Sequence, residues 1–374
     1  MSTTTARRVD GPVADGDNRR IIETTSPCPS SKVTGQSRTL ELLRVAGTHR
    51  EVGEQIGAAC SGAIRRRCEA VDDATVSAAQ PYLEVTRREL PWLVDELDGV
   101  ADATGVDRGA LFAAGIEELD EAATPEPARG CSDLVACAPA SADGGVWVAH
   151  TNDLSASAEQ DLIAIEWRVP GDPVILTVGI GPWISVGFNS AGLSLTGNEV
   201  APNDNRPGIP RLLHVRDIVR RRTLDDAVAA ALHPARASSY NTVLAHAGGG
   251  VVSVEGSATD AELIRPDARG TLAHTNHYVS ERMLPYEGDV DYAARSDVRY
   301  RRALSWLAEG TITAATLRAA ISDHRDAPDS ICRHPGPGSQ TKTVFWCIAD
   351  VTRREITFGR GNPCDSEPQH YAFD

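Results

Sequence analysis

Lysine and long apolar runs are both nearly missing from this chain. Only two of its 37 basic residues are lysines, Lys32 and Lys342, so few side chains are available for Schiff-base chemistry. No stretch approaches the roughly 20 consecutive apolar residues that a membrane-spanning helix needs. These absences argue against a lysine-based enzyme and against a membrane protein.

Clustered positive charge is missing as well. The net charge is -15, and the basic runs Arg65–Arg67 and Arg220–Arg222 are short and far apart. Binding to phosphate groups needs grouped Lys and Arg side chains, so we expect no nucleic-acid partner. With 374 residues, 41% of them hydrophobic and 24% charged, the chain has the composition of a globular protein with a sizeable core.

The spacings that indicate a zinc site are also absent. The chain has eight cysteines and ten histidines, but no C-x-x-C pair and no H-x-x-x-H pattern. We therefore predict no structural metal and no cofactor. The cysteines are dispersed, and the start of the chain lacks a cationic and then apolar signal segment. Reduced thiols and a cytoplasmic location are expected.

The pattern along the chain changes from helical to β. Residues 1–37 are rich in Ser, Thr and Pro, which predicts a disordered leader. Residues 38–130 contain a short strand near Leu40 and then mostly helical periodicity, with Gly105 ending one helix and Asp107 capping the next. Short β-branched runs dominate residues 131–374, interrupted by two helical insertions. This order favours an α+β fold over alternating βαβ units.

Cys131 directly follows Gly130, between a Pro-rich approach at residues 124–127 and a β-rich run. A cysteine in a soluble chain is usually a small buried hydrophobe, and we read the other cysteines in this way. As the first residue of a new chain, however, Cys131 would carry its own base, an α-amine with a pKa of about 7.7 to 8.0. Gly130 permits a close approach of the thiol to its carbonyl. We interpret Gly130-Cys131 as a bond that the protein cuts in itself.

Later polar segments provide candidate partners for Cys131. Asp153 belongs to a predicted turn that closes the first β hairpin, where its carboxylate could orient the amine; an ordinary Asn-Asp turn is an equal alternative. Asn189 lies at a strand-to-turn junction, in a sequence whose residues also favour an ordinary turn. Asn276 could donate its side-chain amide to an oxyanion, whereas spacing favours a hydrogen-bonded filler role for His277.

Taken together and in order, these segments resemble the acyl-CoA:isopenicillin N acyltransferase family of N-terminal-nucleophile hydrolases. The segment Gly47–Gly57 (GTHREVGEQIG) also looks like the N-terminal part of that family, and the likeness covers roughly residues 40 to 372. The segments that carry the resemblance are Gly130-Cys131, Asn152-Asp153, Gly187–Gly192, His274–His277 and Ser330–Arg333.

The resemblance implies an αββα four-layer sandwich with a helical N-terminal segment, made active by autocleavage. A small α subunit, or pro-segment, would span residues 38–130, and the catalytic β subunit would span residues 131–374 in the same structural domain. Cys131 would be the nucleophile and Asp153 would hold its amine. Asn276 would line the oxyanion hole, and Arg333 would lie near the nucleophile.

Other positions depart from the family pattern or carry less specific expectations. Related bile-salt hydrolases have an arginine where His150 stands, which changes the electrostatics there, and Asn152 stands where the family often has an aromatic residue. We assign His150, Asn189 and His277 to substrate contacts. Cys332, next to Arg333, is expected to face the core.

The leading hypothesis is a self-processing cysteine acyltransferase or amidohydrolase that acts on a C–N amide or thioester bond of a small, peptide-like metabolite. Acyl-CoA is a candidate co-substrate, and the α and β subunits of one cleaved chain are the expected partners. Two alternatives stay open. One is a pure amide hydrolase on the same scaffold, and the other is a member that uses the fold only for binding.

Overall fold

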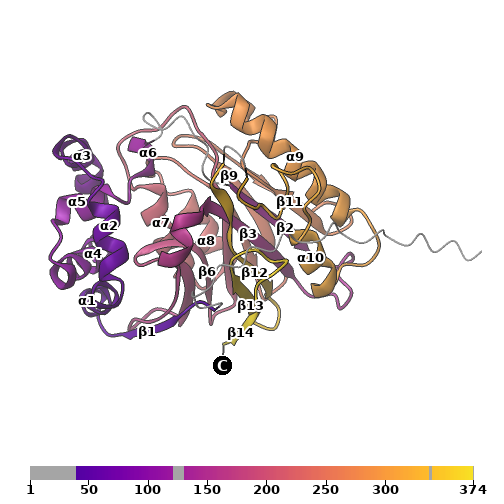
Figure 1. Cartoon of the computed structure of the whole chain (residues 1–374), viewed down its shortest axis with the longest axis horizontal. Coiled ribbons are helices and arrows are strands. Elements are labelled where there is room, and N and C mark those ends of the chain that lie inside the picture. The colour runs from indigo at the N-terminus through magenta and orange to yellow at the C-terminus, as the bar shows by residue number, and fades with distance from the viewer. Residues whose placement is uncertain (1–38, 121–129, 337–338, 374) are drawn as a thin grey trace, which may run out of the picture.

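The computed structural model describes residues 39–120, 130–336 and 339–373, and two β-sheets lie face to face between layers of helices (Figure 1). The expected αββα sandwich is therefore confirmed. The predicted leader at residues 1–37 and the Pro-rich approach to Cys131 lie outside the described residues. Within them, no helix is long and apolar enough to cross a membrane.

The larger sheet has eight strands in the order β1-β4-β5-β6-β7-β8-β9-β10, and the smaller has six in the order β11-β2-β3-β12-β13-β14. All neighbouring strands pair antiparallel except β1 and β4. The strands of the larger sheet are β1 (Leu42–Ala46), β4 (Ile163–Arg168), β5 (Ile175–Ile180), β6 (Trp183–Asn189), β7 (Leu193–Asn198), β8 (Asn241–His246), β9 (Val251–Gly256) and β10 (Ala261–Ile264). Those of the smaller are β2 (Gly130–Ala136), β3 (Trp147–Ser155), β11 (Thr271–His274), β12 (Thr341–Asp350), β13 (Glu355–Arg360) and β14 (Gln369–Ala372).

Helices cover the outer face of each sheet. The N-terminal helices, together with α7 and α8, lie over the larger sheet, and α9 and α10 lie over the smaller one (Figure 1). The helices are α1 (His49–Ala59), α2 (Ser61–Cys68), α3 (Asp73–Glu89), α4 (Pro91–Thr104), α5 (Arg108–Ala113), α6 (Glu117–Asp120), α7 (Arg211–Val219), α8 (Leu224–Ala231), α9 (Val290–Leu307) and α10 (Ala314–Ile321), with 3₁₀ turns at η1 (Ala156–Asp161) and η2 (Leu284–Tyr286).

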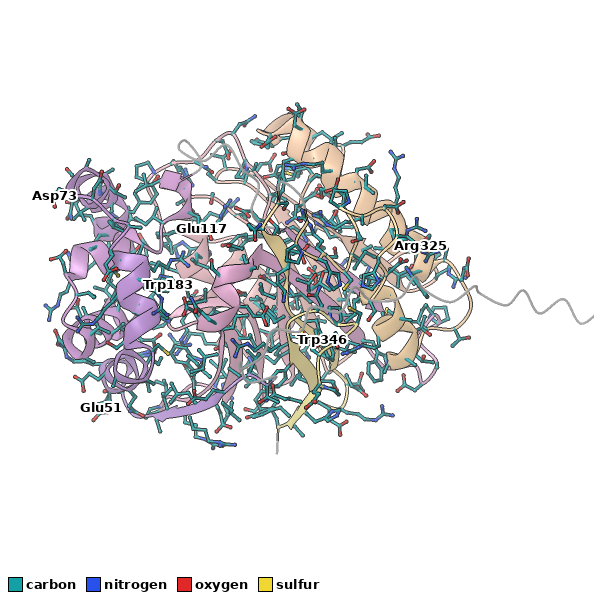
Figure 2. The ribbon with its side chains drawn as sticks, in the orientation of Figure 1. Glu51, Asp73, Glu117, Trp183, Arg325 and Trp346 are labelled. Carbon is teal, nitrogen blue, oxygen red and sulfur yellow. The ribbon has the colours of Figure 1, made fainter. Side chains whose placement is uncertain are left out.

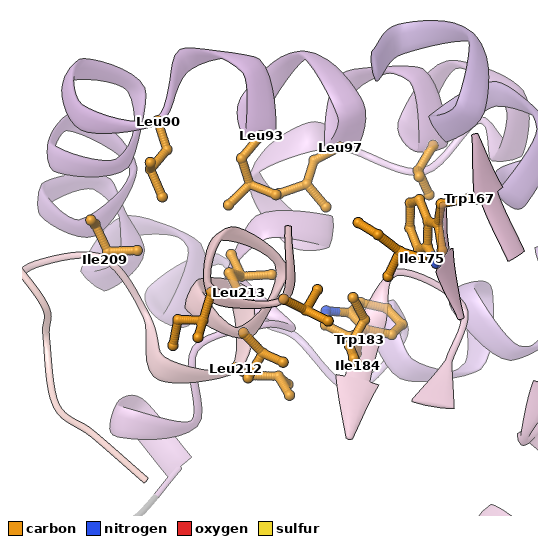
Figure 3. Packing of buried hydrophobic residues seen from close by; sticks show 14 of the residues in the cluster. Leu90, Leu93, Leu97, Trp167, Ile175, Trp183, Ile184, Ile209, Leu212 and Leu213 are labelled. Atoms are coloured by element: carbon orange, nitrogen blue, oxygen red, sulfur yellow. The ribbon is translucent and has the colours of Figure 1, made fainter. Parts of the chain in front are cut away.

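Three apolar cores separate the four layers. The first lies between the larger sheet and its helices, where Leu93 and Leu97 of α4 face Trp167 and Trp183 of the sheet (Figure 3). The second lies between the two sheets, and the third lies between the smaller sheet and α9 and α10. Alternating strand residues therefore enter different cores, which is the pattern of a sheet buried on both faces.

Local signals set several helix ends as the sequence predicts. Gly105 ends α4 in the left-handed conformation with φ 69°, and the Asp107 side chain accepts a hydrogen bond from the Ala110 N–H at the start of α5. The backbone leaves the helical region at Cys60, which separates α1 from α2.

One local expectation is wrong. Asn152 and Asp153 do not form a hairpin turn, because they lie inside strand β3, which is paired along this stretch with β2 on one side and β12 on the other. Hydrogen bonding of the backbone on both sides outweighs the turn propensity of Asn and Asp. As a result, these polar side chains are buried rather than placed at the surface.

Helices α1 and α4 approach each other closely at two glycines. A Cβ atom added to Gly53 would lie 1.9 Å from the Glu96 carbonyl oxygen, and one added to Gly99 would lie 2.2 Å from the Arg50 carbonyl oxygen. Both neighbours are backbone atoms, which cannot rotate away. The glycines of the Gly47–Gly57 segment thus act through packing that holds the N-terminal helices together.

We predict that Gly53→Ala lowers the free energy of unfolding by about 1 to 3 kcal/mol, because the added methyl group forces α1 and α4 apart. Chemical denaturation measures this change. Gly62→Ala is the matched control, since Gly62 is an exposed helical glycine whose added Cβ would meet only the end of the Arg66 side chain at 3.4 Å. The control should be neutral or stabilising. Equal effects of the two substitutions would contradict the packing role.

Candidate active site

A cavity of about 330 Å³ reaches Cys131 from the side of α7. It forms because β6 and β7 pair only at Gly187–Leu195 and Phe188–Ser194. Beyond these pairs, residues of both strands line the cavity instead of bonding to each other. Its wall is mainly apolar, with polar groups at a few points, as is usual for small-molecule sites. The apolar lining residues include Ile180, Trp183, Ile184, Leu195, Leu212 and Val215.

Cys131 is the second residue of β2, and its side chain faces the space between the two sheets. Alternation along the strand places Val135 in the core between the sheets, so Cys131 and Asp133 point the same way. Across the ladder, Cys131 is paired with Asn152, whose side-chain Nδ2 lies 3.7 Å from the Cys131 Sγ. Both residues line the cavity. The thiol therefore sits where a substrate in the cavity would reach it.

Gly130 faces the opposite side of the smaller sheet, where three charged side chains meet. A Cβ atom at Gly130 would lie 3.1 Å from Asp153 Oδ2, 3.2 Å from Arg333 Nη1 and 3.3 Å from Arg299 Nη2. All three side chains are buried. The other carboxylate oxygen of Asp153 accepts a hydrogen bond of 2.7 Å from the Thr343 hydroxyl. A glycine at this position leaves room for the charged groups.

These surroundings shift the pKa values of the central groups. Burial raises the pKa of the Cys131 thiol well above its usual value, and the Asp153 and Asp133 carboxylates add to the rise, while Arg299 opposes it. Burial also raises the pKa of Asp153, against the opposite effect of Arg333 and Arg299. In the intact chain, the thiol is thus a protonated, weakly nucleophilic group at neutral pH.

Asn276 connects Cys131 to helix α9. Its side-chain Oδ1 accepts a 2.8 Å hydrogen bond from the Cys131 backbone N–H and a second bond from the Arg299 guanidinium. Its Nδ2 donates to the carbonyl oxygen of Glu199 at 3.0 Å. In the intact chain Asn276 therefore presents its oxygen to Cys131, whereas the side-chain amide nearest to the Sγ is that of Asn152.

His150 lies behind Cys131 rather than in the cavity wall. Its Nδ1 is 2.9 Å from Asp133 Oδ1, both side chains are fully buried, and its ring packs against Phe345. The imidazole shares the face of β3 with Asn152, but His150 is two residue pairs further along the ladder, opposite Asp133. The assignment of His150 to direct substrate contact is not supported by this placement.

Asn189 and His277 have structural partners elsewhere. The Asn189 amide donates to the carbonyl oxygens of Val219 and Arg221 at 2.8 and 2.7 Å, and its Oδ1 accepts two backbone N–H groups of the following turn. His277 bonds Ser296 of α9 at 2.8 Å. Neither residue lines the cavity, so the assignment of both to substrate contacts is not supported. Asn189 instead holds the end of α7 against the β6–β7 turn.

Sequence reasoning missed Arg299, which contacts the site from α9. Tyr292, Ser296 and Arg299 lie on one face of this helix at helical spacing, and all three are buried. Ser296 accepts a 2.5 Å hydrogen bond from the Asn276 backbone N–H. The missed signal was a polar stripe on the face of a helix that otherwise packs against a sheet. Cys332 is buried, as expected.

A charged group forms the polar end of the cavity near α6. Tyr240 donates a 2.5 Å hydrogen bond to Glu117, and Arg211 bridges Glu117 and Glu199 with distances of 3.1 and 2.9 Å. Burial raises the pKa of Tyr240 well above its usual value, so the phenol stays protonated. Glu117 and Trp183 both lie on the side of the molecule toward the N-terminal helices (Figure 2). This end of the cavity suits a polar or charged part of a ligand.

Comparisons with known proteins extend this description. The sequence model of the family described as acyl-coenzyme A:6-aminopenicillanic acid acyl-transferase matches residues 140–365, more than half of the chain, in a range that begins after Cys131. A search of curated proteins gives no match.

Solved structures of amidases are also similar to this chain. An N-acylethanolamine-hydrolyzing acid amidase ortholog of Caenorhabditis elegans aligns with 16% identity and a TM-score of 0.42, over 59% of this chain and 93% of that one. A variant of the conjugated bile acid hydrolase of Clostridium perfringens aligns with 11% identity and a TM-score of 0.43, over 65% of this chain and 97% of that one.

The partly buried His277 generates a prediction about pH. Burial lowers the pKa of His277 to about 4, below the value of about 6.5 for an exposed imidazole. Between these values the unfolded chain binds a proton that the folded chain does not, so stability should fall as the pH drops from about 6.5 toward 4. The contribution of His277 between pH 7 and pH 5 is up to about 2 kcal/mol. Urea denaturation at pH 7 and at pH 5 should show a smaller loss of stability in His277→Gln than in the wild-type chain. An equal loss in the two proteins would refute the prediction.

Proposed function

Because the chain belongs to the acyl-coenzyme A:6-aminopenicillanic acid acyl-transferase family, we propose that it is a self-processing cysteine acyltransferase or amidohydrolase that works through an acyl-Cys131 intermediate. The observation that carries the proposal is the position of Cys131. It lies at the start of a strand, on the wall of the cavity, directly after a glycine that is surrounded by buried charged groups.

The first reaction is cleavage of the chain itself. The Cys131 Sγ attacks the Gly130 carbonyl carbon, a C–S bond forms, the C–N bond breaks, and the thiol proton passes to the released α-amine. Water then opens the thioester and leaves a Gly130 carboxylate and the free thiol. Arg299 and Arg333 lie beside Gly130, where they offset the negative charge that develops on its oxygen.

After cleavage, the α-amine of Cys131 is the base for its own thiol. It accepts the thiol proton as the Sγ attacks the carbonyl carbon of a substrate, and it returns that proton to the leaving group. In the uncleaved chain, the side-chain Oδ1 of Asn276 accepts a hydrogen bond from the Cys131 backbone N–H. After cleavage this oxygen would hold the new α-amine, together with the Asp153 carboxylate. The Asn152 amide is the nearest side-chain donor for an oxyanion beside the Sγ.

The cavity suits an acyl group with an apolar body. Such a group would pack against Trp183, Leu195 and Leu212, and a polar substituent would reach the group formed by Glu117 and Tyr240. An amine or a water molecule then removes the acyl group from Cys131. A small, peptide-like amide or a thioester such as acyl-CoA fits this scheme. A reducing compartment such as the cytoplasm would keep the thiol reduced.

Whether an amine or water accepts the acyl group is decided by a product assay. The cleaved protein is incubated with an acyl thioester in the presence and absence of an amine acceptor, and the products are identified by mass spectrometry. Amide product supports acyl transfer, and free acid alone supports the hydrolase alternative. If neither forms and N-acyl amides are also untouched, the protein uses the fold only for binding.

Self-cleavage gives the first test. We predict that purified wild-type protein yields two fragments on a denaturing gel, with Cys131 as the N-terminal residue of the larger one, and that Cys131→Ala yields one full-length band. Cys137→Ala is the matched control, because Cys137 follows the same strand but does not line the cavity. The control should be cleaved like the wild type. An intact and inactive wild-type chain would remove the proposal.

The oxyanion role of Asn152 gives a kinetic prediction. In cleaved protein, Asn152→Ala should lower kcat by roughly 100-fold with little change in KM, because the lost hydrogen bond forms mainly in the transition state. Steady-state kinetics with an acyl thioester measures both constants. A raised KM with an unchanged kcat would instead show that Asn152 only binds substrate.

A further inference from the structure

A second group of metal-ligating side chains lies outside the cavity, at one end of strands β12 and β13 of the smaller sheet. It consists of His324, Cys332, His334 and Cys364, whose nitrogen and sulfur atoms all lie within 4.8 Å of one another. His324 follows α10, Cys332 and His334 precede β12, and Cys364 follows β13. Three separate segments of the chain therefore bring two thiols and two imidazoles to one point.

Four of the distances within this group are close to those of a tetrahedral metal site. Zinc bonds of about 2.3 Å to sulfur and about 2.0 to 2.1 Å to nitrogen place tetrahedral ligand atoms about 3.8 Å apart for two sulfurs, about 3.6 Å for sulfur and nitrogen, and about 3.4 Å for two nitrogens. The Cys332 and Cys364 Sγ atoms are 3.7 Å apart. The His334 Nε2 is 3.7 Å from the first Sγ, 3.4 Å from the second and 3.2 Å from the His324 Nε2.

From this geometry we propose that His324, Cys332, His334 and Cys364 bind one zinc ion. On binding, the two thiols lose their protons to solvent, and each histidine uses its Nε2. Two thiolates balance the charge of the dication. Two sulfur and two nitrogen ligands in a tetrahedron favour zinc over harder ions. All four positions are filled by protein, so the site is structural and leaves no place for a reacting water.

The neighbouring residues support the ligands. The Asn362 amide donates to the Cys332 Sγ at 3.5 Å and to the Arg333 carbonyl oxygen at 2.6 Å. Arg318 of α10 binds the carbonyl oxygens of Pro363 and Ser366 on both sides of Cys364. Such contacts hold ligand-bearing loops in place and are typical of metal sites. Trp346, which stacks on Arg318, lies on the side of the molecule that carries α10 (Figure 2).

A disulfide between Cys332 and Cys364 is the main alternative. It requires an S–S distance of about 2.05 Å and would draw the sulfurs away from the imidazoles. Instead, the Cys364 Sγ lies as close to the His334 Nε2 as a shared metal would place it. Converging imidazole nitrogens, which a disulfide leaves without a common partner, favour the metal.

The sequence hides this site because its ligands are not regularly spaced. Cys332 and His334 are separated by one residue, and His324 and Cys364 are supplied by distant segments. Our expectation of no structural metal relied on local spacings such as C-x-x-C, which the fold does not need here. The expectation is replaced by the present proposal.

Metal analysis tests the proposal without any assay of activity, so it can fail or succeed independently of the proposed function. The full chain, purified without a histidine tag and dialysed against metal-free buffer after zinc supplementation, should contain about one zinc ion per chain by plasma mass spectrometry. Cys332→Ser and Cys364→Ser should each reduce the zinc content at least tenfold. Cys137→Ser, a cysteine outside the cluster, should keep it.

Cobalt replacement covers the case in which the variants fail to fold. Zinc is removed from the wild-type chain with a chelator, retention of secondary structure is checked by circular dichroism, and cobalt is added. Visible bands of tetrahedral cobalt with thiolate ligands should appear in a one-to-one titration. A wild-type chain with far less than one zinc ion and no such bands, or a Cys332–Cys364 disulfide in non-reduced peptides, would overturn the proposal.

Discussion

A carboxylate and two guanidinium groups are buried around the α-carbon of Gly130, and the arrangement of the site depends on this cluster. Taking an ion out of water costs several kcal/mol unless opposite charges and hydrogen bonds compensate. Asp153 is compensated by Arg299, Arg333 and the Thr343 hydroxyl, each supplied by a different element. A helix, a loop and two strands are thereby held to one position, and a Cβ atom at Gly130 would crowd the charged groups there at 3.1 to 3.3 Å.

The two faces of the smaller sheet carry different parts of the site. Alternation along β2 sends the Cys131 side chain into the cavity and directs Gly130 toward α9. The Cys131 thiol, which is the proposed nucleophile, and the charged cluster are thus on opposite sides of one strand, and the peptide bond between Gly130 and Cys131 joins them. Charges behind the strand can act on the Gly130 carbonyl without entering the cavity. The substrate then meets a mainly apolar wall.

The sequence predicts the local features well and the long-range ones only through resemblance. Gly105 and Asp107 identify helix ends because caps act within a few residues. The predicted turn at Asn152-Asp153 is wrong because turn propensity acts locally. The pairing of β3 with β2 and β12, which outweighs it, involves distant segments of the chain. Asp153 was linked to Cys131 as a carboxylate that could orient its amine and then by family likeness, but Arg299 was missed because no spacing along the chain connects it to them. Its side chain reaches the site only through the packing of α9 on the sheet.

The proposed metal site and the charged cluster share one short segment. Arg333 stands between Cys332 and His334, its backbone N–H bonds the Thr343 hydroxyl at 3.0 Å, and that hydroxyl also bonds Asp153. An arginine has a long side chain, and confining it beside Gly130 costs conformational entropy that a loop alone does not offset. The two metal ligands that flank Arg333, Cys332 and His334, would fix the backbone from which the guanidinium extends. A zinc ion at this end of β12 and β13 would therefore position a charge at the proposed cleavage site without taking part in the reaction.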